Sequence, residues 1–488
     1  MTATDTATAT PVPVVELSGV ETITTGTAQS ACRTRVGRVS DVPLPVSGPA
    51  TLRVAARSRG VLIMLGSTAV WPLVNISATG FSVVCIAISG MYLMRWPTPR
   101  SFVPIVLVGL GSVGYAVAAA VNGTSPTNQT MLVFPAVALY IVGISVLASS
   151  LDEILALLAG ISLGTVGFYV VLGTDLTTGG SLADIWKYGL APPMTVLVLY
   201  VIASKTVRPW WSVLALTGLA GASVLLNYRS HALICVLAAV VVLCRGRRAP
   251  MSRVRTAAAL AVVGIAFSVV ITSLGANGTL GSKLQEKVEL QATAHVSPLL
   301  AGRTEPPLSL TAIAARPLLG WGNADHIDST TFAAARRFAS DLGFARSYPI
   351  EYLWRLPNGS VSLHSIILGS WAEGGVLAVL FPVWLLFAAM LLASGPLDAG
   401  RWMPLVITVG FQSAWDLAFS PWSYNLAAVC AVVACLAVRL TIHRRRVRVS
   451  APDRTSSRPS PTRPARPHAP TPVEPAYTGR HRLLEESQ

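Results

Sequence analysis

Charged side chains are scarce in this 488-residue chain. Asp, Glu, Lys and Arg make up 12% of the residues, 52% are hydrophobic, and the mean hydropathy is +0.59. A soluble domain carries about 25% charged residues, and a soluble chain of this length would show charged helix faces between its apolar runs. The deficit excludes an ordinary soluble protein. Apolar runs near the ~20 residues that cross a bilayer recur between Gly60 and Leu440.

Cysteine is also rare, and it is not arranged for metal or disulfide chemistry. The chain has six Cys residues, none with the spacing of a zinc site, and five of them fall in apolar runs. We interpret those five as small buried hydrophobic residues. The predicted outer side has no Asp-x-Asp and no His/Cys cluster, so we expect neither a metal nor a cofactor.

Lysine occurs only four times, so the net charge of +15 comes almost entirely from arginine. The arginines stand at the ends of apolar runs and in the two tails. Orientation in a membrane therefore explains the charge better than binding to nucleic acid does. We expect contact with a lipid bilayer and none with nucleic acid.

The apolar runs predict an all-α integral membrane protein with about 12 transmembrane helices. The first two runs are short and are compatible with two full spans or with a re-entrant pair. No cleavable signal peptide is recognisable, and the first run would serve as an uncleaved anchor. The predicted spans are 60–76, 79–94, 102–121, 131–150, 153–173, 190–204, 210–227, 231–244, 256–275, 374–394, 403–419 and 423–441.

Charge favours one orientation of these spans. If the N-terminus lies in the cytoplasm, the inner segments carry nearly all the basic residues, while the short outer segments hold little more than Lys187 and Arg229. Both termini are then cytoplasmic, in a multi-pass protein of the inner (plasma) membrane. The predicted parts are a disordered tail (1–59), nine spans (60–275), one large extracytoplasmic loop (276–362), three spans (363–441) and a disordered basic tail (442–488).

The large loop is nearly neutral, with eight Lys or Arg and seven Asp or Glu residues. Short helices are expected at 285–291, 309–315 and 331–345. Loops of this length are commonly functional or disordered, and this one holds enough aromatic and aliphatic residues to fold against the membrane surface.

One glycine pattern is misleading. Residues Gly109 to Gly114 match the dinucleotide-binding fingerprint, but they lie inside an apolar run without a preceding strand. Small residues that allow close helix packing are the better interpretation.

Four polar residues on the predicted outer side are candidates for a site. Arg229 breaks the charge rule for outer turns, although a snorkelling arginine is the simpler explanation. Arg303 is a loop cation that a surface position would also explain. His364 places an imidazole where the large loop re-enters the membrane, which an interfacial histidine would also do. Asp416 lies near the outer end of a span, where pairing with a buried arginine is the structural alternative.

Together, these cations, one possible base and one carboxylate suit a lipid-linked pyrophosphate sugar. Arg guanidinium binds phosphate through two hydrogen bonds. His364 would then take a proton from an acceptor hydroxyl, while the arginines stabilise charge on the leaving pyrophosphate. Glu373 follows His364 by nine residues and stands next to Gly374-Gly375, and an interfacial turn residue would also explain it.

The chain resembles the O-antigen ligase and O-antigen polymerase family of membrane glycosyltransferases. The likeness rests on Arg229-Ser230 between two outer helix ends, on Arg303 followed by the motif Arg316 to Gly322, and on His364 followed by Glu373-Gly-Gly375, over about 210–425. In the family, a helix often follows the loop arginine, where this chain has Pro306-Pro307.

The resemblance implies a glycosyltransferase-C-like fold and an active site on the extracytoplasmic face. It implies transfer of a glycan from an undecaprenyl-pyrophosphate donor to a hydroxyl of an acceptor glycan, without a metal and with inversion. Arg229 and Arg303 would bind the pyrophosphate, His364 would be the catalytic base, and Asp416 would be a functional carboxylate that binds substrate. Ligase and polymerase share the donor site, so these residues do not separate the two, and they leave the oligomeric state open.

Two other functions compete with this one. A polytopic transporter or lipid-linked glycan flippase would place functional charges near the bilayer midplane. A membrane scaffold would leave the loop residues freely replaceable.

Overall fold

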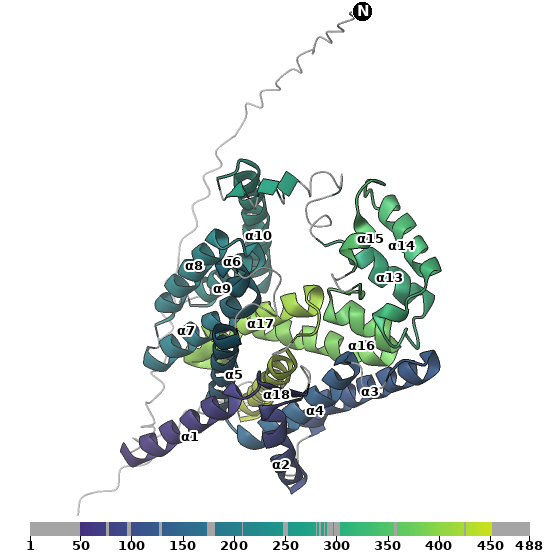
Figure 1. Cartoon of the computed structure of the whole chain (residues 1–488). Coiled ribbons are helices and arrows are strands. Elements are labelled where there is room, and N and C mark those ends of the chain that lie inside the picture. The colour runs from purple at the N-terminus through teal and green to yellow at the C-terminus, as the bar shows by residue number, and fades with distance from the viewer. Residues whose placement is uncertain are drawn as a thin grey trace, which may run out of the picture. The chain divides into compact units, whose positions relative to one another are not determined.

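The computed structural model describes residues 49–450 with short gaps, and the described residues are mostly helical (Figure 1). The expectation of disordered tails therefore falls largely outside the described residues, and that for a helix at 285–291 falls partly outside them. The gaps are 75–77, 95–98, 126–128, 173–180, 207, 247–251, 280, 283–284, 287, 290–295, 297–302, 356–358 and 424–425.

The helices follow the apolar runs of the sequence. They are α1 (Pro49–Ser67), α2 (Gly80–Met94), α3 (Pro99–Asn122), α4 (Gln129–Leu147), α5 (Leu151–Leu172), α6 (Leu182–Ile185), the π-helix η1 (Trp186–Leu190), α7 (Ala191–Lys205), α8 (Pro209–Leu225), α9 (Arg229–Arg245), α10 (Arg253–Ala276), α13 (Pro306–Ala315), the 3-10 helix η2 (Ala324–His326), α14 (Ser329–Asp341), α15 (Ile350–Leu353), α16 (Ile366–Ala393), the 3-10 helix η3 (Leu397–Trp402), α17 (Met403–Phe419) and α18 (Leu426–Ser450).

Six stretches of described helix are long and apolar enough to cross a membrane, by length and composition: Phe102–Asn122, Thr130–Leu147, Leu151–Leu172, Leu182–Lys205, Val254–Ala276 and Ile366–Ala393. Shorter apolar helices cover Gly80–Tyr92, Pro209–Leu225, Pro306–Ala315 and Leu426–Ile442. The protein is therefore an all-α membrane protein, and the count of twelve spans stays a prediction.

The span predicted at 60–76 is wrong in its bounds. Helix α1 begins at Pro49 and ends at Ser67, and the chain then forms a two-stranded antiparallel ribbon of β1 (Pro72–Val74) and β2 (Ala78–Thr79). The backbone N–H groups of Thr68 and Ala69 donate to the carbonyls of Leu65 and Gly66, so the helix ends in a turn before Pro72 is reached. Likewise, α18 continues to Ser450, past the boundary predicted at 441. A helix can extend beyond the bilayer because its hydrogen bonds are internal.

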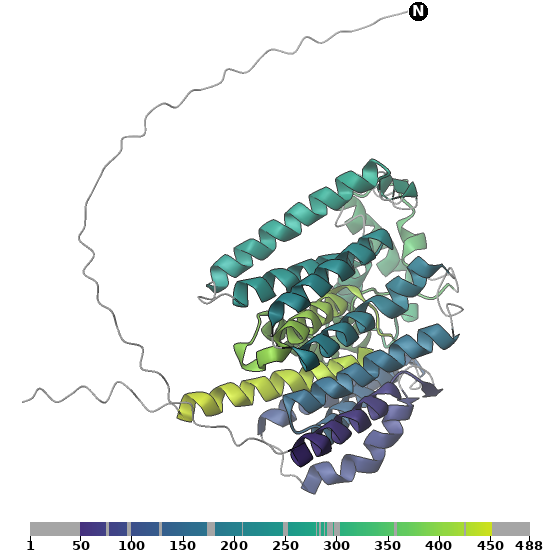
Figure 2. The same cartoon turned by 90° about the vertical axis from the view of Figure 1, so that its left-hand side faces the viewer.

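Many of the long helices lie side by side (Figure 2), and several of them pack against α16 and α18. Helix α16 lies against α3 and α17, while α18 contacts α4, α5 and α16. The large loop has a hydrophobic core of its own, formed by α13 to α15 around Leu308, Trp321, Phe332 and Trp354. The helices predicted at 309–315 and 331–345 correspond to α13 and α14. Pro306 and Pro307 do not interrupt a helix, because they occupy the first turn of α13, where proline is favoured.

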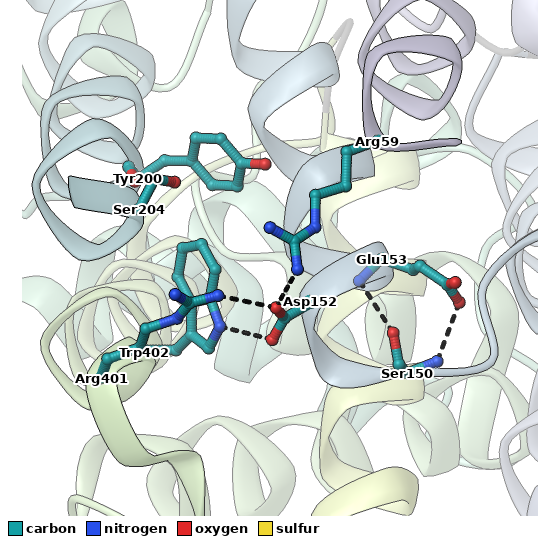
Figure 3. Close-up of polar contacts among 8 residues, drawn as sticks. All are labelled: Arg59, Ser150, Asp152, Glu153, Tyr200, Ser204, Arg401 and Trp402. Atoms are coloured by element: carbon teal, nitrogen blue, oxygen red, sulfur yellow. Dashed lines mark hydrogen bonds and ion pairs between the residues drawn. The ribbon is translucent and has the colours of Figure 1, made fainter. Parts of the chain in front are cut away.

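A charged cluster joins residues of several helices (Figure 3). The carboxylate of Asp152, at the start of α5, pairs with Arg59 of α1 and with Arg401 of η3, the latter at 2.8 Å. The indole N–H of Trp402 donates to the same carboxylate at 2.6 Å, and Tyr200 of α7 stacks on Trp402 with ring centroids 5.2 Å apart. One carboxylate thus joins α1, α5 and η3.

Candidate functional site

A cavity of about 1030 Å³ lies at the other ends of α5 and α17 from the Asp152 cluster. Tyr169 lines it near the end of α5, and Asp416 and Phe419 line it near the end of α17. At 1.5 Å rise per residue, these positions are tens of ångströms from Asp152 and Trp402. All four residues singled out in the sequence, Arg229, Arg303, His364 and Asp416, line this one cavity. Segments that are far apart in the chain therefore supply one site.

Arg229 is the first residue of α9 and follows a tight turn. Asn227 adopts a left-handed conformation (φ 56°), and the backbone N–H of Tyr228 donates to the carbonyl of Ser223 at 2.7 Å. The turn aims Arg229 into the cavity, where its side chain is half-buried. Its guanidinium forms no hydrogen bond or ion pair with a described residue. A desolvated cation without a partner is costly, so this position favours an anionic ligand.

The buried His231 holds this turn in place. Its Nδ1 lies 2.9 Å from Ser223 Oγ, and its Nε2 lies 3.1 Å from Thr195 Oγ1. Thr195 donates its own proton to the carbonyl of Ala191, so its oxygen accepts from Nε2–H. Ser223, which accepts from the indole of Trp186, then donates to Nδ1. Both ring nitrogens of a neutral imidazole are thus satisfied, and we assign His231 a structural role.

Arg303 reaches the cavity from the large loop. It donates from NH1 to the carbonyl of Phe419 at 2.9 Å, and its guanidinium carbon lies 5.0 Å from the Phe419 ring centroid and 5.5 Å from that of Trp415. Burial lowers the pKa of Arg303, whereas Glu305, Tyr228 and Asp416 raise it. Because arginine has so high a starting pKa, the group remains a cation at neutral pH. The cation–π contacts fix its plane and leave other N–H donors for a ligand.

Asp416 lies on α17 and is already engaged by neighbours on its own helix. Gln412 donates to both carboxylate oxygens, at 3.0 and 3.1 Å, and Ser420 donates to Oδ1 at 3.1 Å. Asp416 interacts electrostatically with Arg303 but forms no ion pair with it within 4 Å. The carboxylate therefore balances the charge of the cavity without neutralising Arg303.

His364 stands just before α16, where Ser365 caps the helix by accepting from the backbone N–H of Leu368 at 3.2 Å. Its Nδ1 lies 3.2 Å from Glu305 Oε1 and 3.2 Å from Ser362 Oγ. Glu305 also lines the cavity, and the sequence analysis missed it. The sequence did offer one indication, because Glu305 stands only two residues after the candidate Arg303.

Glu373 does not line the cavity. It lies where the Gly320-Trp-Gly322 motif contacts the Glu373-Gly-Gly375 motif. The motif around Gly320-Trp-Gly322 is hydrogen-bonded to the bend in α16: Trp321 N–H donates to Ala372 O at 2.8 Å, and Gly322 N–H donates to Glu373 O at 2.7 Å. The Glu373 carboxylate accepts from Ala324 N–H and from the Tyr115 hydroxyl, both at 3.2 Å. These contacts, which we call the clasp, attach the folded loop to the membrane helices.

Two glycines of the pattern at Gly109 to Gly114 allow close helix packing, as expected. A Cβ atom on Gly111 would lie 2.4 Å from the Phe134 ring, and one on Gly114 would lie 2.8 Å from the carbonyl of Gly374. Among the described residues, no three His, Cys, Asp or Glu side chains are grouped as a metal site would require.

Part of the chain matches a known protein family. Residues 211–383 match the family model described as O-antigen ligase, a stretch that contains Arg229, Arg303, Glu305 and His364 but ends before Asp416. No curated protein and no solved structure matches the chain. The resemblance drawn from the sequence is confirmed over this stretch. Over residues 211–383, the chain is therefore similar to the O-antigen ligase family.

Proposed function

We propose that this protein is a surface-polysaccharide ligase or polymerase. In this proposal, it transfers a glycan from an undecaprenyl-pyrophosphate carrier to a hydroxyl group of an acceptor glycan. The proposal rests on one observation. Arg229, Arg303 and His364 all belong to the family-matched stretch, and all three line one cavity of about 1030 Å³. This volume is at the upper end of the roughly 300–1,000 Å³ of small-molecule sites, which suits a lipid-linked sugar together with an acceptor.

The two arginines are suited to the pyrophosphate. Arg229 offers a guanidinium without a partner among the described residues, and Arg303 has N–H donors beyond the one that contacts Phe419. Guanidinium groups bind phosphate oxygens through paired hydrogen bonds and stabilise the charge that develops on a leaving group. In this proposal, they hold the pyrophosphate without a metal ion.

His364 is suited to the acceptor. Its Nδ1 is engaged by Glu305 and Ser362, while Nε2 has no partner among the described residues. In the proposed step, the acceptor oxygen attacks the anomeric carbon and its proton passes to Nε2. The bond between that carbon and the pyrophosphate oxygen breaks, and undecaprenyl pyrophosphate leaves with the electron pair. Attack from the face opposite the leaving group inverts the sugar carbon.

The positions of these groups favour an enzyme over a transporter or flippase. Arg229 begins α9, Asp416 lies in the last turn of α17, and His364 precedes α16. Groups at helix ends lie near a membrane surface, whereas a transporter needs its binding groups near the midplane. We place this end of the bundle on the extracytoplasmic side, with both termini in the cytoplasm. The Asp152 cluster then lies on the cytoplasmic side, as the positive-inside rule requires for Arg59 and Arg401.

The test is complementation of a deletion strain with the wild type, Arg303→Ala or His364→Ala. Matched controls are Arg337→Ala and His326→Ala, which change exposed residues of the same loop. Membrane levels are measured by immunoblot, surface polymer by gel electrophoresis, and lipid-linked glycan by extraction. We expect both cavity variants to lose long polymer and to accumulate short lipid-linked glycan, with the controls like wild type. Full polymer in both cavity variants would refute the proposal.

A further inference from the structure

We propose that Glu305 is a positioning residue that orients His364 and fixes its proton on Nδ1. The inference rests on the function proposed above and adds a residue to its machinery. The carboxylate oxygen Oε1 lies 3.2 Å from Nδ1, and both side chains line the cavity. The Glu305 side chain is only 16% exposed, against 32% for His364, so the carboxylate is the more enclosed partner.

The pairing determines which nitrogen can act as a base. Glu305 Oε1 lies 3.2 Å from Nδ1, and Ser362 Oγ hydrogen-bonds to the same nitrogen. A carboxylate beside Nδ1 favours a proton on that nitrogen, because a carboxylate accepts hydrogen bonds and repels a lone pair. In a neutral imidazole, the lone pair then stands on Nε2, the nitrogen without a partner among the described residues. A carboxylate behind a histidine selects the tautomer and stabilises the imidazolium that forms when Nε2 takes a proton.

The buried Trp354 is hydrogen-bonded to both segments that carry Glu305 and His364. The indole N–H of Trp354 donates to the carbonyl of Thr304 at 2.7 Å, next to Glu305. The carbonyl of Trp354 accepts from the backbone N–H of Ser362 at 3.0 Å, two residues before His364. Trp354 is fully buried in the loop core. The segments that carry Glu305 and His364 are thus attached to the same rigid residue, which sets their separation.

The charges around the pair leave Glu305 available to His364. Arg303, Arg229 and Asp416 share the cavity, and the pKa of Tyr348 is raised by burial and by the nearby charge of Glu305. Arg303 is only two residues away, but it donates to the carbonyl of Phe419 and lies over the Phe419 and Trp415 rings. Among the described residues, the basic side chain within 4 Å of the Glu305 carboxylate is His364, not Arg303. If Glu305 were only a surface carboxylate, we would expect it to pair with Arg303 instead.

The experiment measures transfer by the full-length protein in native membranes, with lipid-linked glycan extracted from the deletion strain as the donor. The variants are Glu305→Gln, Glu305→Asp, His364→Ala and the double variant Glu305→Gln/His364→Ala. Glu351→Gln is the matched control, because Glu351 pairs with Arg336 on the surface of the same loop. Immunoblots normalise every rate to the amount of protein in the membrane.

We expect Glu305→Gln to lower kcat at least about tenfold with the KM for donor unchanged, because an amide can face Nδ1 with its NH₂ group and select the wrong tautomer. Glu305→Asp should recover part of the rate, and Glu351→Gln should match wild type. The double variant should be no slower than His364→Ala alone, since Glu305 acts only through His364.

Three results would count against these assignments, and they can be told apart. Wild-type rates in Glu305→Gln with a slow His364→Ala would overturn the positioning role and leave the proposed function standing. A double variant slower than His364→Ala by the factor that Glu305→Gln shows alone would mean that Glu305 acts independently of the histidine. A wild-type rate in His364→Ala would instead refute the base assigned in the proposed function.

Discussion

The carbonyl oxygen of Leu318 lies where a side chain on Gly375 would begin. Gly375 has φ 69°, and a Cβ atom there would lie 2.1 Å from that oxygen. The backbone N–H of Val376 donates to the same carbonyl at 3.1 Å. The bend in α16 and the Leu318 turn are therefore shaped for each other, and the glycine is what allows their close approach.

The clasp predicts that Gly375→Ala is destabilising. The substitution forces an unfavourable left-handed conformation, which costs about 1–2 kcal/mol, and it also pushes Leu318 away from the bend. We expect a lower thermal unfolding temperature in detergent and a several-fold loss of polymer formation. Gly109→Ala is the control, because no atom lies within 4 Å of its added methyl group and a helical alanine is favoured over glycine. Equal stability of the two variants would contradict the importance of the clasp.

Arg229 predicts a specific kinetic effect. Since its guanidinium has no described partner to lose, Arg229→Ala should leave protein stability nearly unchanged. The KM for the lipid-linked donor should rise at least about tenfold, as expected when a charge-assisted phosphate contact is lost. Arg229→Lys should rescue part of the loss, because it keeps the charge but not the paired donors. Transfer rates against donor concentration in native membranes give the answer, and an unchanged KM in Arg229→Ala would remove this residue from the donor site.

The sequence predicted the parts of the fold that hydrophobic length controls. Most of the long helices coincide with apolar runs, and the folded character of the large loop was visible in its aromatic residues. The end of α1 was not predicted, because apolar residues continue past Ser67, where the structure makes a turn and then the β1–β2 ribbon. The clasp could not be predicted either. Its backbone hydrogen bonds join segments that are distant in the chain, and they depend on glycine conformations rather than on side-chain type.

For the candidate site, the sequence predicted which residues share a membrane side but not which residues touch. Arg303, His364 and Asp416 were recognisable because charges are rare in such a chain. Glu305 was not recognisable, because it is distant from His364 in the chain. The two meet only in the folded loop, where the buried Trp354 is hydrogen-bonded to both of their segments. His231 shows the reverse case, since a polar residue beside Arg229 is held in a satisfied structural network.

Asp152 predicts a stability effect far from the cavity. Asp152→Asn keeps an acceptor for the Trp402 indole but leaves Arg59 and Arg401 facing each other without a counter-charge. The side chains are about one-third exposed, so we expect a loss of roughly 1–3 kcal/mol, between the values for surface and buried pairs. Thermal unfolding in detergent measures it, with Asp341→Asn on the exposed end of α14 as the control. Unchanged unfolding would show that the cluster is not stabilising.

Asp328 predicts how the stability of the loop depends on pH. It caps the N-terminus of α14: Oδ1 accepts from the backbone N–H of Thr331 at 2.7 Å and from the Thr330 hydroxyl at 2.8 Å. The first of these hydrogen bonds is the main cause that lowers the pKa of Asp328 below its ordinary value. A lowered pKa in the folded state means that the ionised carboxylate contributes stability above the unfolded pKa of about 3.9, and that this contribution is lost as the pH falls through the folded value.

Asp328→Ala should therefore destabilise α14 by about 1 kcal/mol at pH 7, the usual cost of losing a helix cap, and by less in strong acid. The stability of α14 in Asp328→Ala and in wild type is compared by hydrogen exchange of the α14 amides at pH 7. Rates of proteolytic cleavage within the loop at pH 7 and pH 3 give the dependence on pH. Asp341→Ala is the matched control, because its carboxylate lies at the opposite end of α14, where a negative charge is unfavourable and its removal should cost nothing. A difference between Asp328→Ala and wild type that stayed the same at pH 7 and pH 3 would show that the cap does not depend on the ionised carboxylate.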